Sequence, residues 1–479
     1  MKTPLRRLVA WIIGTVAGLI GVIYVLLAAG LKLSAWDARV SLEGAEKIST
    51  SSVIRARHSP HTMTLLDHGL SSLSARLSLI RSAKQSIELE FFIYDLDFSA
   101  KWITSELVER AKAGVKVRLL VDFAGPIFKL RPEYAEFLRR NGVEVRYYNT
   151  SPIYRFVSVH HRNHRKLLVV DDQASIIGGR NIADDYFDLS PHYNFLDSDV
   201  LVGGAIVQDM RETFDLYWQS TFSRVPEKVE PRDFLALEAG EAEKRQQVET
   251  AGRAILATEF QGNCADVLYV TDFPGVAESN RLVYSTVKEL LAGASEEVLG
   301  ESPYFVLTRE GAELIRSATQ RGVDMRVVTN SLYTTDAYYA VAALWLGLER
   351  VSASGLSLLA YRSPDVQAPT SDTNLSPVNL RRGIHAKRAV IDSAQYLIGT
   401  YNVDPRSANL NSEMILICRD GRELAEAARG HIIERMAGAQ AVAGPQMTDR
   451  AALIGEAASA NILGMLLITP IAGLFNFLL

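Results

Sequence analysis

The two longest apolar runs of the chain lie at its ends. The first, Leu8 to Leu31, has 24 uncharged residues and would be about 36 Å long as a helix, enough to cross a hydrocarbon core of about 30 Å. A secretory signal has a shorter apolar core of about 7–15 residues, which favours a transmembrane helix over a cleaved signal, although Ala28-Ala29-Gly30 resembles a cleavage site. The pattern therefore predicts a single N-terminal membrane anchor.

Basic residues flank this run unevenly. Lys2, Arg6 and Arg7 precede it, while Lys32 and Arg39 follow it more thinly. Positively charged flanks tend to stay in the cytoplasm. The charges thus predict a cytoplasmic N-terminus and a globular body on the outer face of the membrane.

The last apolar run, Ile462 to Leu479, is interrupted by Pro470 and loosened by Gly464 and Gly473. These breaks favour a re-entrant or interfacial membrane segment over a second span. A core helix of the globular body is the alternative.

Between the ends, one module is used twice. The stretch 109–118 has a counterpart at 316–326, and in each a helix-period pattern ends at a glycine, Gly114 or Gly322, before an apolar or alternating run. The expected strands are 87–94, 115–121 and 167–171 in the first copy and 304–307, 323–329, 388–392 and 414–418 in the second. Helices and strands that alternate in this way predict an α/β sandwich.

Two polar stretches interrupt the repeat. Residues 224–253 are rich in Glu, Lys, Arg and Gln and predict a solvated connector with some helix. Residues 363–382 predict a polar loop before the second copy's candidate motif, either shaping the entrance to a site or forming a plain surface loop.

Composition and charge narrow the function classes. Of the 479 residues 48% are hydrophobic and 22% charged, which fits a globular body with added apolar segments, and the net charge of −4 gives no overall attraction to nucleic acid. Cys264 and Cys418 form no Cys-x-x-Cys motif, so buried free cysteines are favoured over a disulfide or a thiolate metal site.

Each copy also carries the same polar motif. His164-Arg165-Lys166 is followed after four residues by Asp171 and after six more by Gly178-Gly179-Arg180-Asn181. In the second copy His385-Ala386-Lys387, Asp392 and Gly399-Thr400-Tyr401-Asn402 repeat this spacing. A lone His-x-Lys pair carries little information, but two copies with identical spacing indicate a function.

The motif residues suit a phosphodiester. A His and a Lys two apart on a strand point to one face, so each copy offers an imidazole beside a fixed cation. Brought together, Lys166, Lys387, Asn181 and Asn402 would bind the charge on a pentacoordinate phosphorus, while one imidazole attacks and the other protonates the leaving alkoxide. Because the lysines supply the positive charge, no metal or other cofactor is expected.

These motifs resemble the paired HKD motifs of the phospholipase D superfamily, over roughly residues 65–432. Within it, the segments 178–182, 301–306, 329–332 and 402–413 resemble bacterial cardiolipin synthases, the C-type most closely. The resemblance implies two tandem phospholipase D-like α/β sandwich halves with pseudo-two-fold symmetry and a phosphohistidine intermediate. It also implies that an acid orients each histidine, Glu413 for His385 and Asp197, or alternatively Asp199, for His164, and that His164 is the nucleophile and His385 the general acid.

The expected organisation follows from these patterns. It comprises a transmembrane anchor (1–36), a first half (50–223), a connector (224–275), a second half (276–440) and a C-terminal apolar membrane-associated segment (441–479).

Several neighbouring residues are expected to play no part in catalysis. Asp171 and Asp392 end strands, which favours a structural role for both. His160 and His161 are expected to be solvated or to line an entrance, Tyr304 and Phe305 to form core or cleft wall, and the Thr400 hydroxyl to lie near phosphate.

Four possible functions remain to be compared. Transfer of a phosphatidyl group to phosphatidylglycerol, giving cardiolipin, is the leading hypothesis, with phosphatidylethanolamine as a possible donor and the bacterial inner membrane as the location. Hydrolysis to phosphatidic acid uses the same first step, so the motifs cannot separate it. A nuclease is disfavoured by the acidic net charge and the anchor, and an inactive scaffold by two intact motifs.

Overall fold

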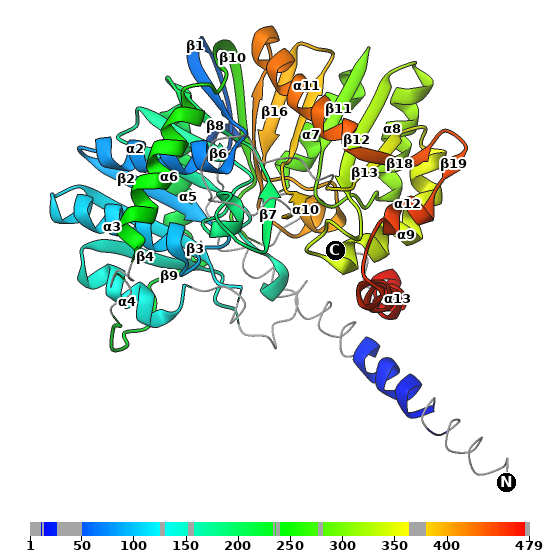
Figure 1. Ribbon diagram of the computed structural model, residues 1–479, viewed down its shortest axis with the longest axis horizontal. Helices are drawn as coiled ribbons and strands as arrows, with labels where there is room; N and C mark the ends of the chain where they lie inside the picture. Colours follow the sequence, from blue (N-terminus) through cyan, green and yellow to red (C-terminus); the bar gives the residue numbers. More distant parts are fainter. Residues whose placement is uncertain are drawn as a thin grey trace.

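The computed structural model describes residues 11, 14–25, 50–124, 130–151, 158–232, 235, 240–275, 281–363 and 380–474. The first half forms a mixed sheet covered by helices, blue to green in Figure 1. Its strands are β1 (Ile54–Leu66), β2 (Ser86–Phe91), β3 (Lys116–Asp122), β4 (Val143–Tyr148), β5 (Leu167–Val170), β6 (Ala174–Gly178), β7 (Tyr193–Leu196), β8 (Asp199–Gly203) and β9 (Ser223–Arg224). Its helices are α2 (Gly69–Ser82), α3 (Phe98–Lys112), α4 (Pro132–Arg140) and α5 (Ile206–Gln219), with single turns η1 (Thr50–Ser52), η2 (Ser158–His160) and η3 (Asp184–Tyr186).

The second half repeats this arrangement, green to red in Figure 1. Its strands are β10 (Gln261–Thr271), β11 (Glu297–Glu301), β12 (Asp324–Asn330), β13 (Ser357–Tyr361), β14 (Arg381–Ile384), β15 (Arg388–Ile391), β16 (Gln395–Gly399), β17 (Met414–Cys418), β18 (Ala439–Gly444) and β19 (Met447–Thr448). Its helices are α7 (Leu282–Gly293), α8 (Arg309–Gln320), α9 (Tyr338–Ala353), α10 (Pro405–Asn409), α11 (Arg422–Ala437), α12 (Arg450–Ile454) and α13 (Ser459–Leu474).

Strand order confirms the predicted repeat. In the first half β2, β3 and β4 are parallel, and β5 runs antiparallel to β2. In the second half β11, β12 and β13 are parallel, and β15 runs antiparallel to β11. Gly114 and Gly322 follow the equivalent helices α3 and α8 with φ of 90° and 94°. Helices often end in this left-handed conformation, and glycine adopts it most easily.

The two halves share one sheet and one core. β1 pairs with β8 and with β10, and β10 pairs with β17, so that one 17-stranded sheet runs through both halves. Residues of α5 and α11 join strand residues from both halves in one buried apolar cluster. Because this core spans the junction, the halves are held face to face rather than linked by a flexible tether.

The region expected to be a connector, 224–275, is more ordered than its composition suggested. It contains α6 (Glu241–Leu256), which buries Val248 and Ala251 in the core of the first half, and the strand β10 at the junction. The many charged residues of α6 made its narrow apolar face difficult to recognise from the sequence.

Two further expectations were wrong. Residues 304–307 are not a strand; the strand is β11, which ends before Pro303, and proline cannot donate to a sheet ladder. Cys264 and Cys418 are not free thiols but form a disulfide, because β10 and β17 are hydrogen-bonded neighbours and bring their Cα atoms to 5.9 Å.

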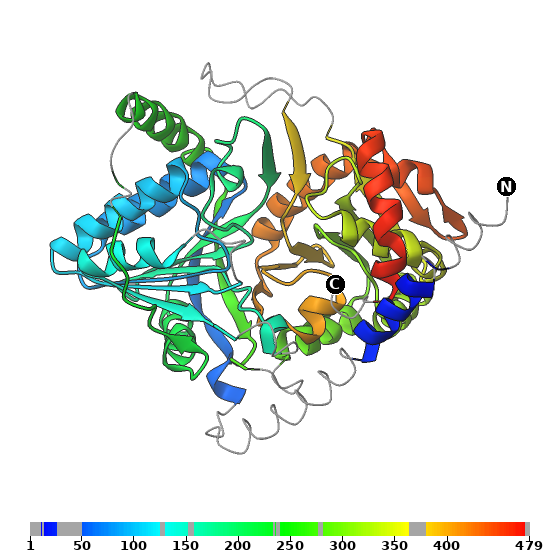
Figure 2. The same cartoon turned by 90° about the horizontal axis from the view of Figure 1, so that it is seen from below.

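The helical residues 14–25 and α13 lie on the same side of the molecule, at the lower right in Figure 1 (see also Figure 2), and α13 packs against α9. Residues 14–25 are helical, and the rest of the predicted span, apart from Trp11, lies outside the described residues. Within the part of the chain that the structure describes, no helix is both long and apolar enough to span a bilayer. The helix α13 buries Met465 and leaves Leu463, Leu466 and Leu467 exposed.

Candidate active site

Backbone pairing between the halves brings the motif residues together. The strand β7 pairs in parallel with β14, so that the residues that follow them, Asp197 and His385, lie side by side. Asn163 forms a parallel bridge with Ser412, which places His164 beside Glu413 in the same way. The backbone amides of His385 and His164 donate to Leu196 O (2.7 Å) and Ser412 O (3.0 Å), respectively.

Each histidine therefore meets the acid of the opposite half. His164 Nδ1 lies 3.0 and 3.1 Å from the carboxylate oxygens of Glu413, and His385 Nδ1 lies 2.6 Å from Asp197 Oδ2. The expected pairing, Glu413 with His385 and Asp197 with His164, was wrong. It assumed that each half completes its own site, whereas the parallel bridges exchange the acids.

A donor network fixes the Glu413 carboxylate. The hydroxyls of Thr400 and Ser407 donate to it at 2.5 and 2.8 Å, and the Asn411 amide donates at 3.2 Å. The Thr400 hydroxyl thus contacts the acid that orients His164. Ser407 and Asn411 were not singled out from the sequence, because polar residues of a short helix and the loop after it give no sign that they converge on one carboxylate.

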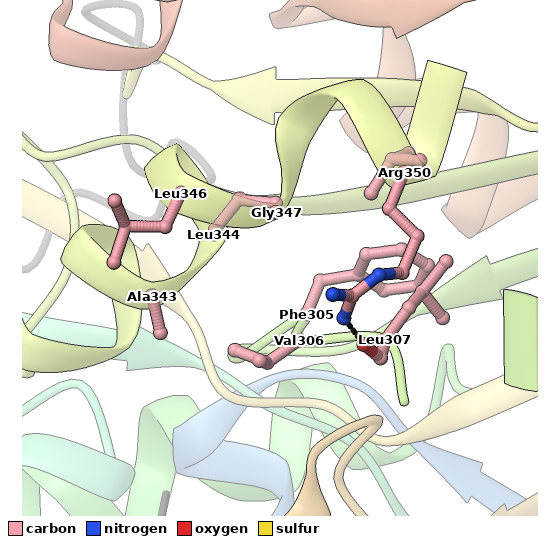
Figure 3. Close-up of a pocket in the computed structure, with 9 residues that line it drawn as sticks. Phe305, Val306, Leu307, Ala343, Leu344, Leu346, Gly347 and Arg350 are labelled. Atoms are coloured by element: carbon pink, nitrogen blue, oxygen red, sulfur yellow. Dashed lines mark hydrogen bonds between the residues drawn. The ribbon is translucent and has the colours of Figure 1, made fainter. Parts of the chain in front are cut away.

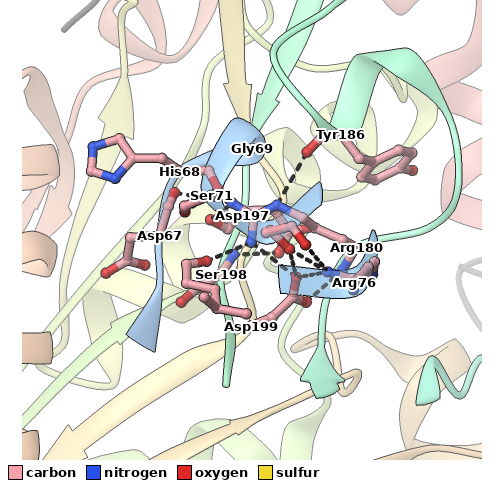
Figure 4. Close-up of polar contacts among 12 residues, drawn as sticks. Asp67, His68, Gly69, Ser71, Arg76, Arg180, Tyr186, Asp197, Ser198 and Asp199 are labelled. Carbon is pink, nitrogen blue, oxygen red and sulfur yellow. Dashed lines mark hydrogen bonds and ion pairs between the residues drawn. The ribbon is translucent and has the colours of Figure 1, made fainter. Parts of the chain in front are cut away.

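Asp199, the alternative orienting acid, has another role. Its Oδ2 pairs with the guanidinium groups of Arg76 (3.0 Å) and Arg180 (3.1 Å), and Arg180 also donates to Asp197 O at 2.6 Å (Figure 4). This buried network holds the backbone of Asp197 and leaves its carboxylate for His385. Gly179 makes room for it, because a Cβ there would lie 2.2 Å from Asp197 Oδ1.

The lysines and asparagines of the motifs are buried beside the histidines. Lys166 Nζ donates to His164 O at 2.7 Å, and Lys387 Nζ lies 3.0 Å from His385 Nδ1. The Asn181 amide donates to Tyr186 Oη at 2.9 Å. Asn402 Oδ1 has no hydrogen-bond partner among the described residues and is available to a ligand.

Electrostatics links both motifs into one site. Burial lowers the pKa of His164 to about 4 and that of His385 to about 3, with the lysines adding to the effect and the acids opposing it. Burial also lowers the pKa of Lys166 to about 7, reinforced by the charge of Lys387, and lowers the pKa of Lys387 to about 8. Two buried ammonium groups, one of which lowers the pKa of the other, favour an anionic ligand such as a phosphodiester.

The motif aspartates are used elsewhere. The Asp171 carboxylate accepts the backbone N–H groups of residues 84–86, and Asp392 accepts those of residues 295–297. Each caps the start of a neighbouring parallel strand, β2 or β11. This is a structural use of both carboxylates.

Comparison with known proteins gives the family. Residues 77–218 and 287–435 match the family described as "Cardiolipin synthase, PLD-like domain", where PLD denotes phospholipase D. The chain belongs to this family.

Several curated proteins resemble the chain in sequence, and one solved structure shares its fold. Cardiolipin synthase C of Escherichia coli is 27% identical, and the match covers 73% of this chain and 79% of the synthase. Cardiolipin synthase A of Pseudomonas aeruginosa is 28% identical, and the match covers 74% of this chain and 63% of the synthase. An uncharacterised Helicobacter pylori protein is 28% identical over 74% and 75%. The crystal structure of phosphatidylserine synthase from Haemophilus influenzae shares the fold, with a TM-score of 0.64 at 14% identity over 87% and 95% of the two chains.

Aromatic rings pack on both histidines of this cardiolipin synthase family member. Phe92 lies edge-on to His164 at 5.1 Å, while Tyr186 and Phe195 lie 5.0 and 4.9 Å from His385. Together with the acids, these rings restrict each imidazole to one orientation. Tyr186 and Phe195 were not predicted as site residues, because aromatic residues in strands and turns are usually core.

His160 and His161 do not form an open entrance as expected. His161 is buried, and its Nδ1 lies 3.0 Å from Leu410 O and 3.2 Å from Arg281. Burial lowers the pKa of His160 to about 4 and that of His161 to about 3, so both are neutral at pH 7. They join the 158–161 turn to the second half.

Two other features do not belong to the site. A pocket of about 180 Å³ between α9 and the segment 305–307 is lined by apolar side chains and Arg350, and it contains neither histidine (Figure 3). Among the described residues, Cys264, Cys418 and Asp420 come close enough together to hold a metal, but the disulfide occupies both sulfurs.

Proposed function

We propose that this protein is a phosphatidyltransferase that makes cardiolipin through a phosphohistidine intermediate. The observation that carries the proposal is the crossed arrangement of His164 with Glu413 and of His385 with Asp197 around two buried lysines. The names of its relatives, cardiolipin synthases C and A, support this choice among phosphodiester reactions.

The first step uses the tautomers that the acids select. Glu413 accepts the Nδ1 proton of His164, which leaves the Nε2 lone pair free to attack phosphorus. The Nδ1–H of His385 donates to Asp197, which leaves Nε2 to act on the head group. Binding of the anionic phosphodiester raises the pKa of His385, so that Nε2 takes up a proton from solvent and gives it to the departing head-group oxygen. The P–O bond breaks as the P–N bond forms.

The second step reverses these roles. The neutral His385 accepts a proton from the terminal hydroxyl of the glycerol head of phosphatidylglycerol, whose oxygen attacks phosphorus and breaks the P–N bond. Lys166, Lys387, Asn181 and Asn402 hold the charge on the equatorial oxygens in both steps. One phosphodiester replaces another, so no nucleotide is consumed.

The apolar ends support action at a membrane. Nearly all side chains of the helical residues 14–25 are exposed apolar groups, and α13 exposes three leucines. We infer that the segment 8–31 anchors the protein and that α13 lies in the bilayer interface. The Cys264–Cys418 disulfide supports a body on the outer face of the inner membrane, because disulfides persist in oxidising compartments.

The test is a lipid assay with purified full-length protein. Vesicles of phosphatidylglycerol, with and without phosphatidylethanolamine, are expected to yield cardiolipin and free head-group alcohol, and chelation of metals is expected to leave the rate unchanged. His164→Ala and His385→Ala are each expected to lower the rate by at least about 10³-fold, because nucleophile and general acid act in one cycle. Phosphatidic acid as the sole product would instead establish a hydrolase.

A further inference from the structure

One exposed carboxylate lies beside this otherwise cationic site. Asp336 belongs to the loop 331–337 between β12 and α9, and its side chain accepts a hydrogen bond from Tyr304 Oη, 3.0 and 3.1 Å from its two oxygens. The mechanism above gives it no role. A surface carboxylate that only maintains solubility needs no fixed position. The hydrogen bond from Tyr304 therefore indicates that the position of this carboxylate matters.

The start of this loop is tied to the second histidine. Asn330 makes two hydrogen bonds with the backbone of Ile384, each of 2.7 Å, and Ile384 immediately precedes His385. Tyr193 of the first half holds the middle of the loop, donating from its hydroxyl to Thr334 O at 2.7 Å. The loop is therefore anchored to both halves on the His385 side.

Aromatic rings connect His385 with this loop. Phe195 lies 4.9 Å from the His385 ring, and Tyr193 lies 4.9 Å from Phe195 in an edge-on arrangement. Tyr339, 45% exposed, follows Asp336 by three residues. Aromatic rings near a carboxylate are the chemistry that recognises an organic ammonium group, through cation–π attraction and an ion pair.

Charge distribution agrees with this placement. The carboxylate of Asp336 is one of the charges that act on Lys387, and Lys387 acts on Asp336 in return. A zwitterionic head group has a phosphate and an ammonium a few bonds apart. Its phosphate would bind to the lysines while its ammonium would reach Asp336.

We propose that Asp336, positioned by Tyr304, binds the ammonium of a zwitterionic phospholipid donor on the side where His385 releases the head group. The inference rests on the proposed function and deepens it by naming a residue that selects between donor head groups. A glycerol head group carries no positive charge and gains no ion pair from Asp336, so the same residue discriminates between the two lipid classes.

The experiment measures release of labelled head group by the full-length protein, from ethanolamine-labelled phosphatidylethanolamine and from glycerol-labelled phosphatidylglycerol in separate vesicles. Asp336→Asn is expected to lower kcat/KM for the zwitterionic donor by about 10-fold or more, chiefly through KM, and to change the anionic donor less than about two-fold. Asp336→Glu is expected to restore part of the loss. Glu313→Gln, an exposed acid on α8, is the matched control and is expected to change neither rate.

The outcomes separate the inference from the proposed function. Equal losses with both donors at unchanged thermal stability, or no loss with either, would overturn the role of Asp336. A wild-type protein that cleaves only the anionic donor would overturn it as well and leave the proposed function standing. Release of no head group from either lipid would overturn both.

Discussion

The two acids of the site serve histidines that lie more than 180 residues away in the chain. His164 and Glu413 are separated by 249 positions, and His385 and Asp197 by 188. Neither half can therefore orient its own imidazole. A half expressed alone would contain a histidine and a lysine without the carboxylate that selects the tautomer.

This crossing predicts which histidine each acid variant disturbs. Glu413→Gln should change the ¹⁵N chemical shifts of His164 and leave those of His385 nearly unchanged, and Asp197→Asn should do the reverse, because each carboxylate accepts only one Nδ1 proton. Both variants should lower kcat by about 10²–10⁴-fold, as expected when a base loses its orienting acid. The variants serve as controls for one another, and a shift at the histidine of the same half would contradict the crossed pairing.

Burial of four ionisable groups predicts a pH dependence. Since the pKa values of Lys166 and Lys387 are lowered to about 7 and 8, kcat/KM should fall as pH rises through that window and the lysines lose the charge that binds phosphate. On the acid side the free histidines stay neutral until about pH 4. A kcat/KM that is level from pH 6 to pH 10 would contradict the lowered lysine values.

Stability follows the same groups with a definite sign. The histidine pKa is near 6.5 in the unfolded chain and about 4 or 3 in the fold, so between these values the unfolded state binds more protons. The contribution of the two histidines to the free energy of unfolding should be complete above pH 6.5 and should decrease as the pH falls toward 4. Thermal unfolding at pH 7 and pH 4.5 measures this, and His164→Ala should lose less stability than wild type over that interval.

At the scale of elements, most of the repeat was predictable. Local signals fixed the helix-ending glycines, β3, β12 and β17, because apolar runs and turn residues act within a few positions. The strand β10 was missed, because its first half mixes exposed and buried residues and it follows the charged stretch within the region expected to be a connector. The crossed acids and the disulfide were also missed, since both depend on pairing between segments that are far apart in the sequence.

The disulfide between β10 and β17 is expected to make a measurable contribution to stability. It joins β10 to β17, closing a loop with a sequence separation of 154, so Cys264→Ser should lower the free energy of unfolding by about 2–5 kcal/mol. Reducing agent should lower the melting temperature of the wild type to about that of Cys264→Ser, and it should leave the melting temperature of the variant unchanged. Equal melting temperatures in all conditions would show that the bond contributes nothing.

At the scale of the whole molecule, the N-terminal helix and α13 lie on the same side of the body (Figures 1 and 2). Leu463, Leu466 and Leu467 of α13 are exposed. For the proposed transfer between two lipids this arrangement would be an advantage, because both substrates would stay in the bilayer while the reaction proceeds. The orientation of the molecule across the membrane then decides which leaflet supplies them.

The basic N-terminus and the disulfide predict that leaflet together. Lys2, Arg6 and Arg7 favour a cytoplasmic N-terminus, and a stable disulfide requires an oxidising compartment, so the body should lie on the outer face of the inner membrane. In spheroplasts of a bacterial host producing the full chain, an added protease should digest the body while a cytoplasmic marker stays intact. In acid-quenched cells Cys264 and Cys418 should resist alkylation until they are reduced. A protected body with two alkylated cysteines would place the site on the cytoplasmic face, whereas a digested body with oxidised cysteines would mean that the enzyme draws its lipids from the outer leaflet.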